Sequence, residues 1–422
     1  MIKDIEPLPH LDAVIPLPGS KSYTQRALVI AALAEGTSVI DGPLFAEDTQ
    51  RLIEALRALG TQITTGNDSV VVKGTGGRIL TPDRPLHLGN NGTAMRLLMT
   101  VAALGKGVIT LTGDPRLCER PVKPLLEALR SMGVDIRSRN DTGFPPVSVH
   151  ADGLRGGPVA LHDIESSQYV SSLLIGAPYA QNDVEINLTG RVPSLPYIRM
   201  TLEAMEHFGR TVESPAPNRY LVKTGSGYRG RGYRVEGDVS SASYFLLAAA
   251  ILKGHVRLEN IKPTTLQGDM GLLALLEALG GSAVRGVDWL EFTGGDLKPG
   301  DYRFDLGDMP DMVPTFAVLS ALRPGQTIID NVAHLRHKES NRLAALVAEL
   351  NRVGITSRET EDGILIRGGT PRGAEIETYD DHRIAMSFAV LGLIVPGMRI
   401  RNIACVNKSF PEFWGILDGL YP

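Results

Sequence analysis

A short polar stretch at residues 18–26, PGSKSYTQR, places Lys21 and Arg26 directly before an apolar run of helical length, residues 27–34. Backbone N–H groups at a helix N-terminus and the helix dipole attract anions, and the two basic side chains add positive charge. The stretch is typical either of an oxyanion or phosphate site or of an ordinary helix capped by serine, and its residues alone leave both open. It is not a nucleotide P-loop, because a serine separates its glycine from its lysine.

Five other helix starts along the chain share this small and polar character. In chain order the six starts read GSKSYTQR, NNGTAMR, ESSQYVSS, GDVSSAS, GDMPDMVPT and YDDHRIAMS. Any one of them could simply be a capped helix. Their recurrence beside basic residues instead favours a shared anion-binding function.

The elements that must position these starts belong to an internal repeat. A second series of helices ends in glycine at near-constant spacing, at Gly60, Gly133, Gly209, Gly280 and Gly354. Glycine suits the residue that follows a helix, and alternating residues after it indicate strands. The repeat therefore predicts six similar α+β units, each with two helices and short strands that pair locally.

The two ends of the chain suggest how the six units are divided. The sixth unit stops at residues 413–422 before its closing strand, and the N-terminal segment 2–17 could return to supply that strand. One domain is then discontinuous, residues 1–16 plus 235–422, and residues 17–234 form the other, with three units in each. We expect the six helix starts to line a cleft between these domains and to attract anions there.

Composition narrows the functional class. A chain of 422 residues exceeds the usual size of one hydrophobic core, and its formal charge of −4 gives no support to nucleic acid as a partner. Cys118 and Cys405 are too few for a disulfide framework, and no cysteine and histidine cluster has zinc spacing. The first ten residues lack the features of a signal peptide, and no apolar run reaches membrane-spanning length. We therefore expect a soluble cytoplasmic protein without a metal.

Three further basic clusters leave a surface role and a functional role open. They are LCERP with Arg120, HLRHKESNR at residues 334–342, and VNKSFPEFW with Lys408. A GxGxxG pattern at residues 225–230 is followed by extended chain rather than by a helix, which argues against a dinucleotide site.

Taken together, the motifs resemble those of the 5-enolpyruvylshikimate-3-phosphate synthase family. The resemblance is carried, between about residues 18 and 413, by PGSKSYTQR, LGNNGTAMR, GDPRLCERP, ESSQY, EGDVSSASYF, MPDM, RHKESNR, DDHRIAMSF and NKSFPEF. It implies an α+β fold of two similar domains, each of three βαβαββ repeats, with the active site in the interdomain cleft. It also implies transfer of the carboxyvinyl group of phosphoenolpyruvate to the 5-hydroxyl of shikimate 3-phosphate, with no metal or organic cofactor.

Roles for individual residues follow from that resemblance, position by position. The residues expected to bind shikimate 3-phosphate are Lys21, Ser22, Arg26, Ser166, Ser167, Gln168, Ser194, Tyr197, Asp311 and Lys338. Those expected to bind phosphoenolpyruvate are Lys21, Gly92, Arg120, Gln168, Arg342, Arg383 and Lys408. Arginine forks match carboxylates, and a glycine lets the backbone approach an anion closely. The resemblance further implies a monomer, a place in aromatic amino-acid biosynthesis through the shikimate pathway, and a family that is the target of glyphosate.

The reaction needs an acid and a base. The methylene carbon of phosphoenolpyruvate takes up a proton while the 5-hydroxyl loses one. We expect Glu339 to serve the carbon and Asp311 the hydroxyl, with Lys21 assisting, through a tetrahedral intermediate. Ligands that contact both domains would favour closure, with the hinge at the crossovers near residues 16 and 235.

A few positions depart from the family's common pattern. Thr24 and Gln25 replace a usual Ser-Asn pair, His334 stands where an asparagine is frequent, and Asn341 replaces a frequent aspartate. Leu97 takes the place of a proline, and we hypothesise that it weakens inhibition by glyphosate, which competes for the phosphoenolpyruvate site.

Two other functions compete with this interpretation. The related enolpyruvyl transferase that acts on a UDP-linked amino sugar carries a loop cysteine, but Cys118 lies too close to Arg120 for that loop. A non-catalytic anion-binding protein is disfavoured because Glu339 and Asp311 accompany the basic residues.

Overall fold

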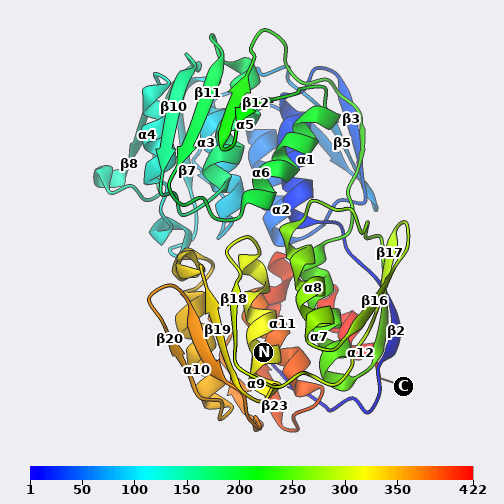
Figure 1. Ribbon diagram of the computed structural model, residues 1–422. Helices are drawn as coiled ribbons and strands as arrows, with labels where there is room; N and C mark the ends of the chain where they lie inside the picture. The colour runs from blue at the N-terminus through cyan, green and yellow to red at the C-terminus, as the bar shows by residue number, and fades with distance from the viewer. Residues whose placement is uncertain (422) are drawn as a thin grey trace. The chain divides into compact units, whose positions relative to one another are not determined.

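The computed structural model describes residues 1–421 and divides into two compact units (Figure 1). The middle unit is Lys21–Val235, and the split unit joins Met1–Ser20 to Glu236–Pro422. The domain boundaries expected from the sequence, after residues 16 and 234, remain a prediction about how the chain folds and moves.

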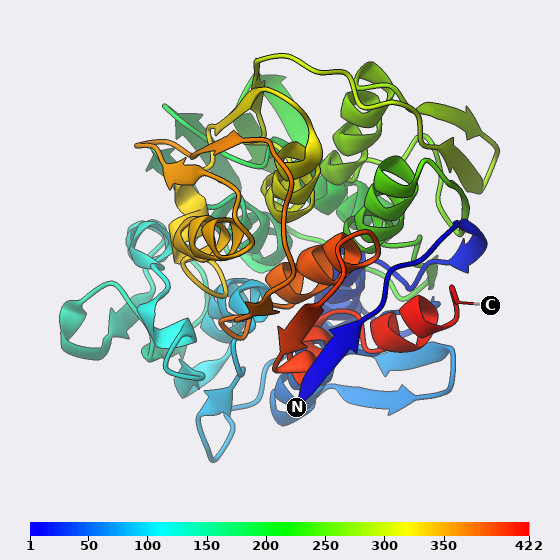
Figure 2. The same cartoon turned by 90° about the horizontal axis from the view of Figure 1, so that it is seen from below.

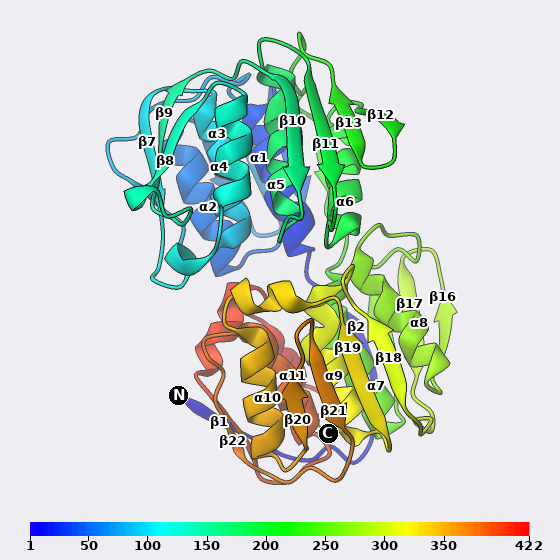
Figure 3. The same ribbon diagram turned by 60° about the vertical axis from the view of Figure 1, so that its left-hand side comes forward.

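The middle unit contains three four-stranded sheets of one repeated pattern. In each sheet the first two strands are parallel, and the third and fourth join by antiparallel pairing. The spatial orders are β14 (Gly232–Arg234), β3 (Thr37–Asp41), β5 (Ser69–Lys73), β4 (Gln62–Thr65); β6 (Leu86–His87), β7 (Lys106–Thr112), β9 (Val147–Asp152), β8 (Asp135–Ser138); and β10 (Gly157–His162), β11 (Val184–Thr189), β13 (Arg219–Val222), β12 (Glu213–Ala216). Strands β10, β11 and β13 can be followed side by side in Figure 3.

The split unit repeats the same pattern twice and then ends on a three-stranded sheet. The spatial orders are β2 (Asp12–Pro16), β15 (His255–Glu259), β17 (Trp289–Thr293), β16 (Ser282–Arg285); β18 (Tyr302–Asp305), β19 (Gln326–Asp330), β21 (Ile364–Arg367), β20 (Ser357–Glu359); and β22 (Glu375–Ile376), β23 (Met398–Arg401), β1 (Ile2–Ile5). The N-terminal strand β1 runs antiparallel to β23, so the first strand of the chain supplies the partner that the shortened sixth unit lacks (Figure 2).

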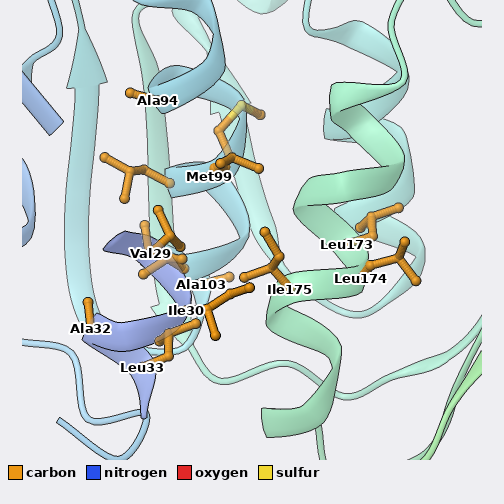
Figure 4. Close-up of a cluster of buried hydrophobic side chains, with 14 of the residues drawn as sticks. Val29, Ile30, Ala32, Leu33, Ala94, Met99, Ala103, Leu173, Leu174 and Ile175 are labelled. Carbon is orange, nitrogen blue, oxygen red and sulfur yellow. The ribbon is translucent and has the colours of Figure 1, made fainter. Parts of the chain in front are cut away.

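Helices of the middle unit form its hydrophobic core. They are α1 (Lys21–Leu33), α2 (Glu47–Ala58), α3 (Gly92–Ala103), α4 (Lys123–Ser131), α5 (Gln168–Gly176) and α6 (Leu195–His207). Figure 4 shows Val29 and Leu33 of α1, Met99 of α3 and Ile175 of α5 within one cluster of buried side chains. Helices α1, α3 and α5 are buried on nearly every side, so none of them has the separate core and solvent faces of an amphipathic helix.

The split unit builds its core in the same way. Its helices are α7 (Val239–Leu252), α8 (Gly271–Ala278), α9 (Val313–Leu322), α10 (Arg342–Arg352), α11 (His382–Gly392) and α12 (Phe413–Asp418), and α7, α9 and α11 pack on one another. The glycine endings predicted from the repeat are confirmed, since Gly60, Gly133, Gly209, Gly280 and Gly354 all have positive φ after a helix.

The helix starts lie earlier than the apolar runs indicated. Helix α1 begins at Lys21, so Lys21, Ser22 and Arg26 lie on the helix itself, and placing them before a helix over residues 27–34 was wrong. The reason is that the first turns of α1 are buried although they are polar, with Gln25 and Arg26 almost fully enclosed. Because these first two turns are polar, the apolar run alone predicted a helix that starts too late.

Two chain segments connect the middle unit to the split unit. The backbone N–H of Ser20 donates to the carbonyl of Glu236 at 2.8 Å, and that of Asp238 donates to Pro18 at 2.8 Å. The outgoing and returning segments are thus hydrogen-bonded to each other, with Gly19 opposite Gly237.

Candidate active site

The residues expected to do chemistry fall into two sets, one on each unit. On the middle unit, Lys21 opens α1 and its ammonium lies 3.2 Å from a carboxylate oxygen of Asp48 on α2. Both side chains are largely buried, which makes this a well-placed ion pair rather than a solvated surface contact.

Arg26, one turn further along α1, is enclosed by neutral partners. Its Nε donates to the hydroxyl of Thr201 at 2.8 Å, and its terminal nitrogens donate to the carbonyls of Ser22 at 3.0 Å and Tyr197 at 3.2 Å. The Ser171 hydroxyl lies 3.3 Å away. Burial lowers the pKa of Arg26 to about 10, because carbonyl and hydroxyl dipoles replace hydration only in part.

The first turn of α3 lies against a second arginine. Gly92 is the first residue of that helix, and a Cβ built on it would lie 2.5 Å from the guanidinium carbon of Arg120. Asn91 caps the helix by accepting from the N–H of Ala94 at 2.9 Å. A helix N-terminus with a buried guanidinium packed onto its glycine is a favourable place for a phosphate.

Gln168 opens α5 and is held by two side chains of α3. Its amide donates to the hydroxyl of Thr93 at 2.9 Å, and its carbonyl accepts from Arg96 at 2.7 Å. Ser166 and Ser167 directly precede it, and Ser194 is the left-handed residue, φ 60°, before α6. These polar residues thus lie at helix starts.

The split unit carries its set around Arg342, the fully buried first residue of α10. Its guanidinium donates to three carboxylates: Asp381 at 3.0 and 3.2 Å, Asp311 at 3.1 Å and Glu339 at 2.8 Å. Burial lowers the pKa of Arg342, but the three carboxylates outweigh it and raise that pKa above its usual value.

Asp311 joins this cluster to Arg383. It lies in the short helix η5 (Pro310–Met312), and its second oxygen accepts from Arg383 of α11 at 2.8 Å. The ammonium of Lys338 lies 4.0 Å from the first oxygen. Burial alone would raise the pKa of Asp311, but Arg383, Lys338 and Arg342 together lower it well below its usual range.

A further buried acid lies close to this cluster. Asp269, in the short helix η4 (Gly268–Met270), accepts from the Ser240 hydroxyl, while its other oxygen has no hydrogen-bond partner within residues 1–421. Burial, and then the negative charge of Asp311, raise the pKa of Asp269 to about 7.

The sequence analysis named most members of these sets but not the residues that hold them. The structure brings Asp311, Glu339, Lys338, Arg342 and Arg383 together; Lys408 is buried at the end of η7 (Ile403–Lys408). The sequence analysis missed Asp48, Arg96, Asp269 and Asp381. Asp381 had a usable signal, because an Asp directly before a helix is a preferred N-cap, and its carboxylate accepts from the N–H of Arg383 at 3.0 Å.

The described part of the chain, residues 1–421, contains no group of three or more His, Cys, Asp or Glu side chains arranged to hold a metal ion. Nor does it contain a helix long and apolar enough to cross a membrane.

Comparisons with known proteins agree over nearly the whole chain. A family model described as EPSP synthase (3-phosphoshikimate 1-carboxyvinyltransferase) matches residues 5–417. The 3-phosphoshikimate 1-carboxyvinyltransferases of Syntrophobacter fumaroxidans and Methanoculleus marisnigri are 43% and 42% identical, covering 100% and 99% of both chains respectively. A solved EPSP synthase from Acinetobacter baumannii is similar with a TM-score of 0.81 and 29% identity, covering 100% of this chain and 98% of its own.

Proposed function

Because the chain belongs to the EPSP synthase family, we propose that its two sets of basic residues bind the two anionic substrates of that family's reaction. The enzyme transfers the carboxyvinyl group of phosphoenolpyruvate to the 5-hydroxyl of shikimate 3-phosphate and releases phosphate. This is a step of the shikimate pathway, which leads to the aromatic amino acids. The residue roles below are proposals that rest on that reaction.

We assign shikimate 3-phosphate chiefly to the middle unit. Arg26 would bind its carboxylate, because neutral partners leave the positive charge of this guanidinium uncancelled. Ser166, Ser167 and Ser194 would donate to its phosphate, together with Lys338 of the split unit. Ser22, Gln168 and Tyr197 complete the proposed contacts of this substrate.

We assign the phosphate of phosphoenolpyruvate to the first turn of α3 and its basic neighbours. The proposed contacts on the middle unit are Gly92, Arg120, Lys21 and Gln168, and Lys408 of the split unit is proposed to bind the same phosphate. The packing of Arg120 on Gly92 supports the assignment, since backbone N–H groups and a planar cation then point to one volume.

The carboxylate of phosphoenolpyruvate is assigned to Arg342 and Arg383. The observation that carries this assignment is their shared contact with Asp311 at 3.1 and 2.8 Å. Both guanidiniums are already bonded to protein carboxylates, so the substrate must replace some of those contacts. Binding would therefore be selective for a rigid, planar anion that matches both forks.

Substrate binding also provides a way to activate the base. Asp311 is a weak base while Arg342 and Arg383 hold its pKa low. A substrate carboxylate on these arginines would offset part of their charge and raise the pKa of Asp311 toward the range of a useful base. Asp311 would then accept the proton of the 5-hydroxyl only when phosphoenolpyruvate is present.

Glu339 is proposed as the acid for the methylene carbon. Its carboxylate accepts from Arg342 at 2.8 Å, so Glu339 would first take up a proton from solvent and turn away from that guanidinium before it delivers the proton to the substrate. The oxygen of the 5-hydroxyl then attacks the adjacent carbon and a tetrahedral intermediate forms. Loss of a methyl proton expels phosphate, whose charge Lys21, Arg120 and Lys408 would stabilise.

We propose that the enzyme works as a monomer in the cytoplasm and is inhibited by glyphosate. Both cysteines, Cys118 and Cys405, are free thiols, which suits a reducing compartment. Light scattering coupled to size-exclusion chromatography would test the oligomeric state, and a stable dimer would contradict it.

The assignments are tested by two single variants measured with both substrates. Lys21→Ala should depress kcat strongly, because it removes charge next to both reacting groups. Arg26→Ala should chiefly raise KM for shikimate 3-phosphate, by about 10- to 100-fold if one charged hydrogen-bonding group is lost. The reverse pattern would refute the division of residues. Phosphate release with a UDP-linked amino sugar, and none with shikimate 3-phosphate, would overturn the substrate.

A further inference from the structure

The turn between β22 and α11 is held in an unfavourable backbone conformation. Tyr379 and Asp380 are successive non-glycine residues in the left-handed region, with φ of 54° and 56°. Left-handed residues with a Cβ are strained and persist only where the surrounding contacts determine them. The next residue, Asp381, caps α11 and binds Arg342, so this strained turn sets the position of the cluster's main carboxylate.

A buried carboxylate on α10 supplies those contacts. Glu349 is fully buried, and its Oε1 accepts from the Tyr379 hydroxyl at 2.8 Å. Its Oε2 accepts from the backbone N–H of Glu377 at 3.2 Å and from the Nε of Arg352 at 2.8 Å. Burial, together with Glu349 itself, raises the pKa of Tyr379 to about 12, so the phenol remains a donor.

Helix α10 therefore contacts the turn at two points. At its first residue, Arg342 donates to Asp381, whose carboxylate also accepts from Ser340 at 3.0 Å. Two turns later on the same helix, Glu349 holds the opposite end of the turn through Tyr379. A shift of the turn would move Asp381 relative to Arg342 and would also move the capped N-terminus of α11, which carries Arg383.

We propose that Glu349 and Tyr379 are positioning residues for phosphoenolpyruvate, which act by holding the strained turn so that Asp381 orients Arg342 and Arg383. The inference rests on the proposed role of these two arginines at the substrate carboxylate. Neither Glu349 nor Tyr379 touches substrate in this account. Their effect is confined to the orientation of the Arg342 and Arg383 guanidinium groups.

The test is Tyr379→Phe in the full-length enzyme, with steady-state kinetics in both substrates. We expect KM for phosphoenolpyruvate to rise on the order of tenfold, because small displacements of positioned groups have effects of that size or larger. KM for shikimate 3-phosphate and Tm should stay near the wild-type values. Tyr421→Phe is the matched control, since that hydroxyl also donates within the split unit, to the carbonyl of Glu6, but away from this turn.

Glu349→Gln and the double variant show whether the two residues act through one hydrogen bond. Glu349→Gln should also raise KM for phosphoenolpyruvate, and the double variant should be no worse than the more affected single variant. A lowered Tm with an unchanged KM in Tyr379→Phe would show a purely structural role and overturn the inference.

Arg342→Lys separates this inference from the proposed function. If it raises KM for phosphoenolpyruvate while Tyr379→Phe does not, the assignment of the arginines stands and the positioning role is wrong. If Arg342→Lys leaves that KM unchanged, the assignment of the carboxylate site itself fails.

Discussion

Arg26 of the middle unit and Arg342 of the split unit are both buried, yet their surroundings are opposite. Hydroxyls and backbone carbonyls surround Arg26, whereas three carboxylates surround Arg342. Burial accordingly lowers the pKa of one guanidinium, and the carboxylates raise that of the other. Burial of an arginine therefore does not reveal whether its charge is available to a ligand.

The difference suggests two ways to recognise an anion. In the proposed function, Arg26 keeps its charge uncancelled and would attract a substrate carboxylate strongly, although this charge is costly to bury while no ligand is bound. Arg342 has its charge balanced by carboxylates, so the proposed substrate carboxylate would compete with them and would gain mainly in geometric selectivity. Replacement of Asp311, Arg342 or Arg26 tests this contrast, and the largest effect is expected at Asp311, which contacts both Arg342 and Arg383.

Asp311→Asn should lower kcat by roughly 10³- to 10⁴-fold, because it removes the proposed base and replaces one of the two oxygens that accept from Arg342 and Arg383 with an amide donor. The rate of product formation in single-turnover experiments would measure this loss. KM for shikimate 3-phosphate should change much less. A kcat within tenfold of wild type would remove Asp311 from the chemistry and leave it a structural partner of the arginines.

Arg342→Met and Arg26→Met should differ in stability. Loss of Arg342 leaves buried carboxylates without their cationic partner and should lower the free energy of unfolding by about 3–5 kcal/mol. Loss of Arg26 should cost no more than about 1 kcal/mol, because the hydroxyls of Thr201 and Ser171 remain bonded to each other at 2.8 Å. Urea unfolding followed by fluorescence would measure the free energy of unfolding of both variants. Equal losses of stability would contradict the contrast between the two arginines.

Asp269→Asn should remove a pH dependence of stability. The pKa of this acid is about 7 in the folded chain and about 4 when unfolded, so the folded state binds the extra proton between those values. Wild type should therefore lose stability as pH rises from about 4 to 7, by roughly 1–4 kcal/mol, and the variant should not. Asp311, Arg383, Asp238 and Ser240 face this carboxyl.

Chemical denaturation at pH 5 and pH 8.5 would measure the effect of Asp269→Asn. The stability of the variant relative to wild type should be greater at pH 8.5 than at pH 5. Parallel stability curves for the two proteins would show that Asp269 does not titrate in this range.

Leu97→Pro should have the smallest effect, a few-fold greater inhibition by glyphosate. Leu97 is buried in α3, the helix that begins at Gly92, and a proline there removes a backbone donor and shifts the first turn. Inhibition curves at fixed phosphoenolpyruvate would compare the two enzymes. Equal sensitivity would disprove the hypothesis.

Local features of this protein could be predicted from its sequence. The helix endings at Gly60 and Gly354 depend on glycine's freedom to adopt positive φ, which is a property of the residue itself. The strand character of the chain after Gly230 was also evident, because the pattern lacked the helix that a dinucleotide site requires, and β14 lies there.

Long-range pairing could not be predicted in the same way. Which carboxylate contacts Arg342 depends on packing between segments 31 and 39 residues apart, at Asp311 and Asp381. The pairing of β14 with β3 joins residues near opposite ends of the middle unit, and nothing local in either strand specifies it. The early start of α1 was hidden because its polar residues are enclosed by other parts of the fold.

The pairing of β1 with β23 has a consequence for synthesis of the chain on the ribosome. Ile2–Ile5 is synthesised well before its partner Met398–Arg401, because most of the 422 residues lie between them. At typical translation rates of about 5–20 residues per second, the first strand waits roughly 20–80 s for that partner. The middle unit is fully synthesised at Val235 and can fold within that interval. The order in which the two units fold is therefore set by the time of synthesis as well as by their stability.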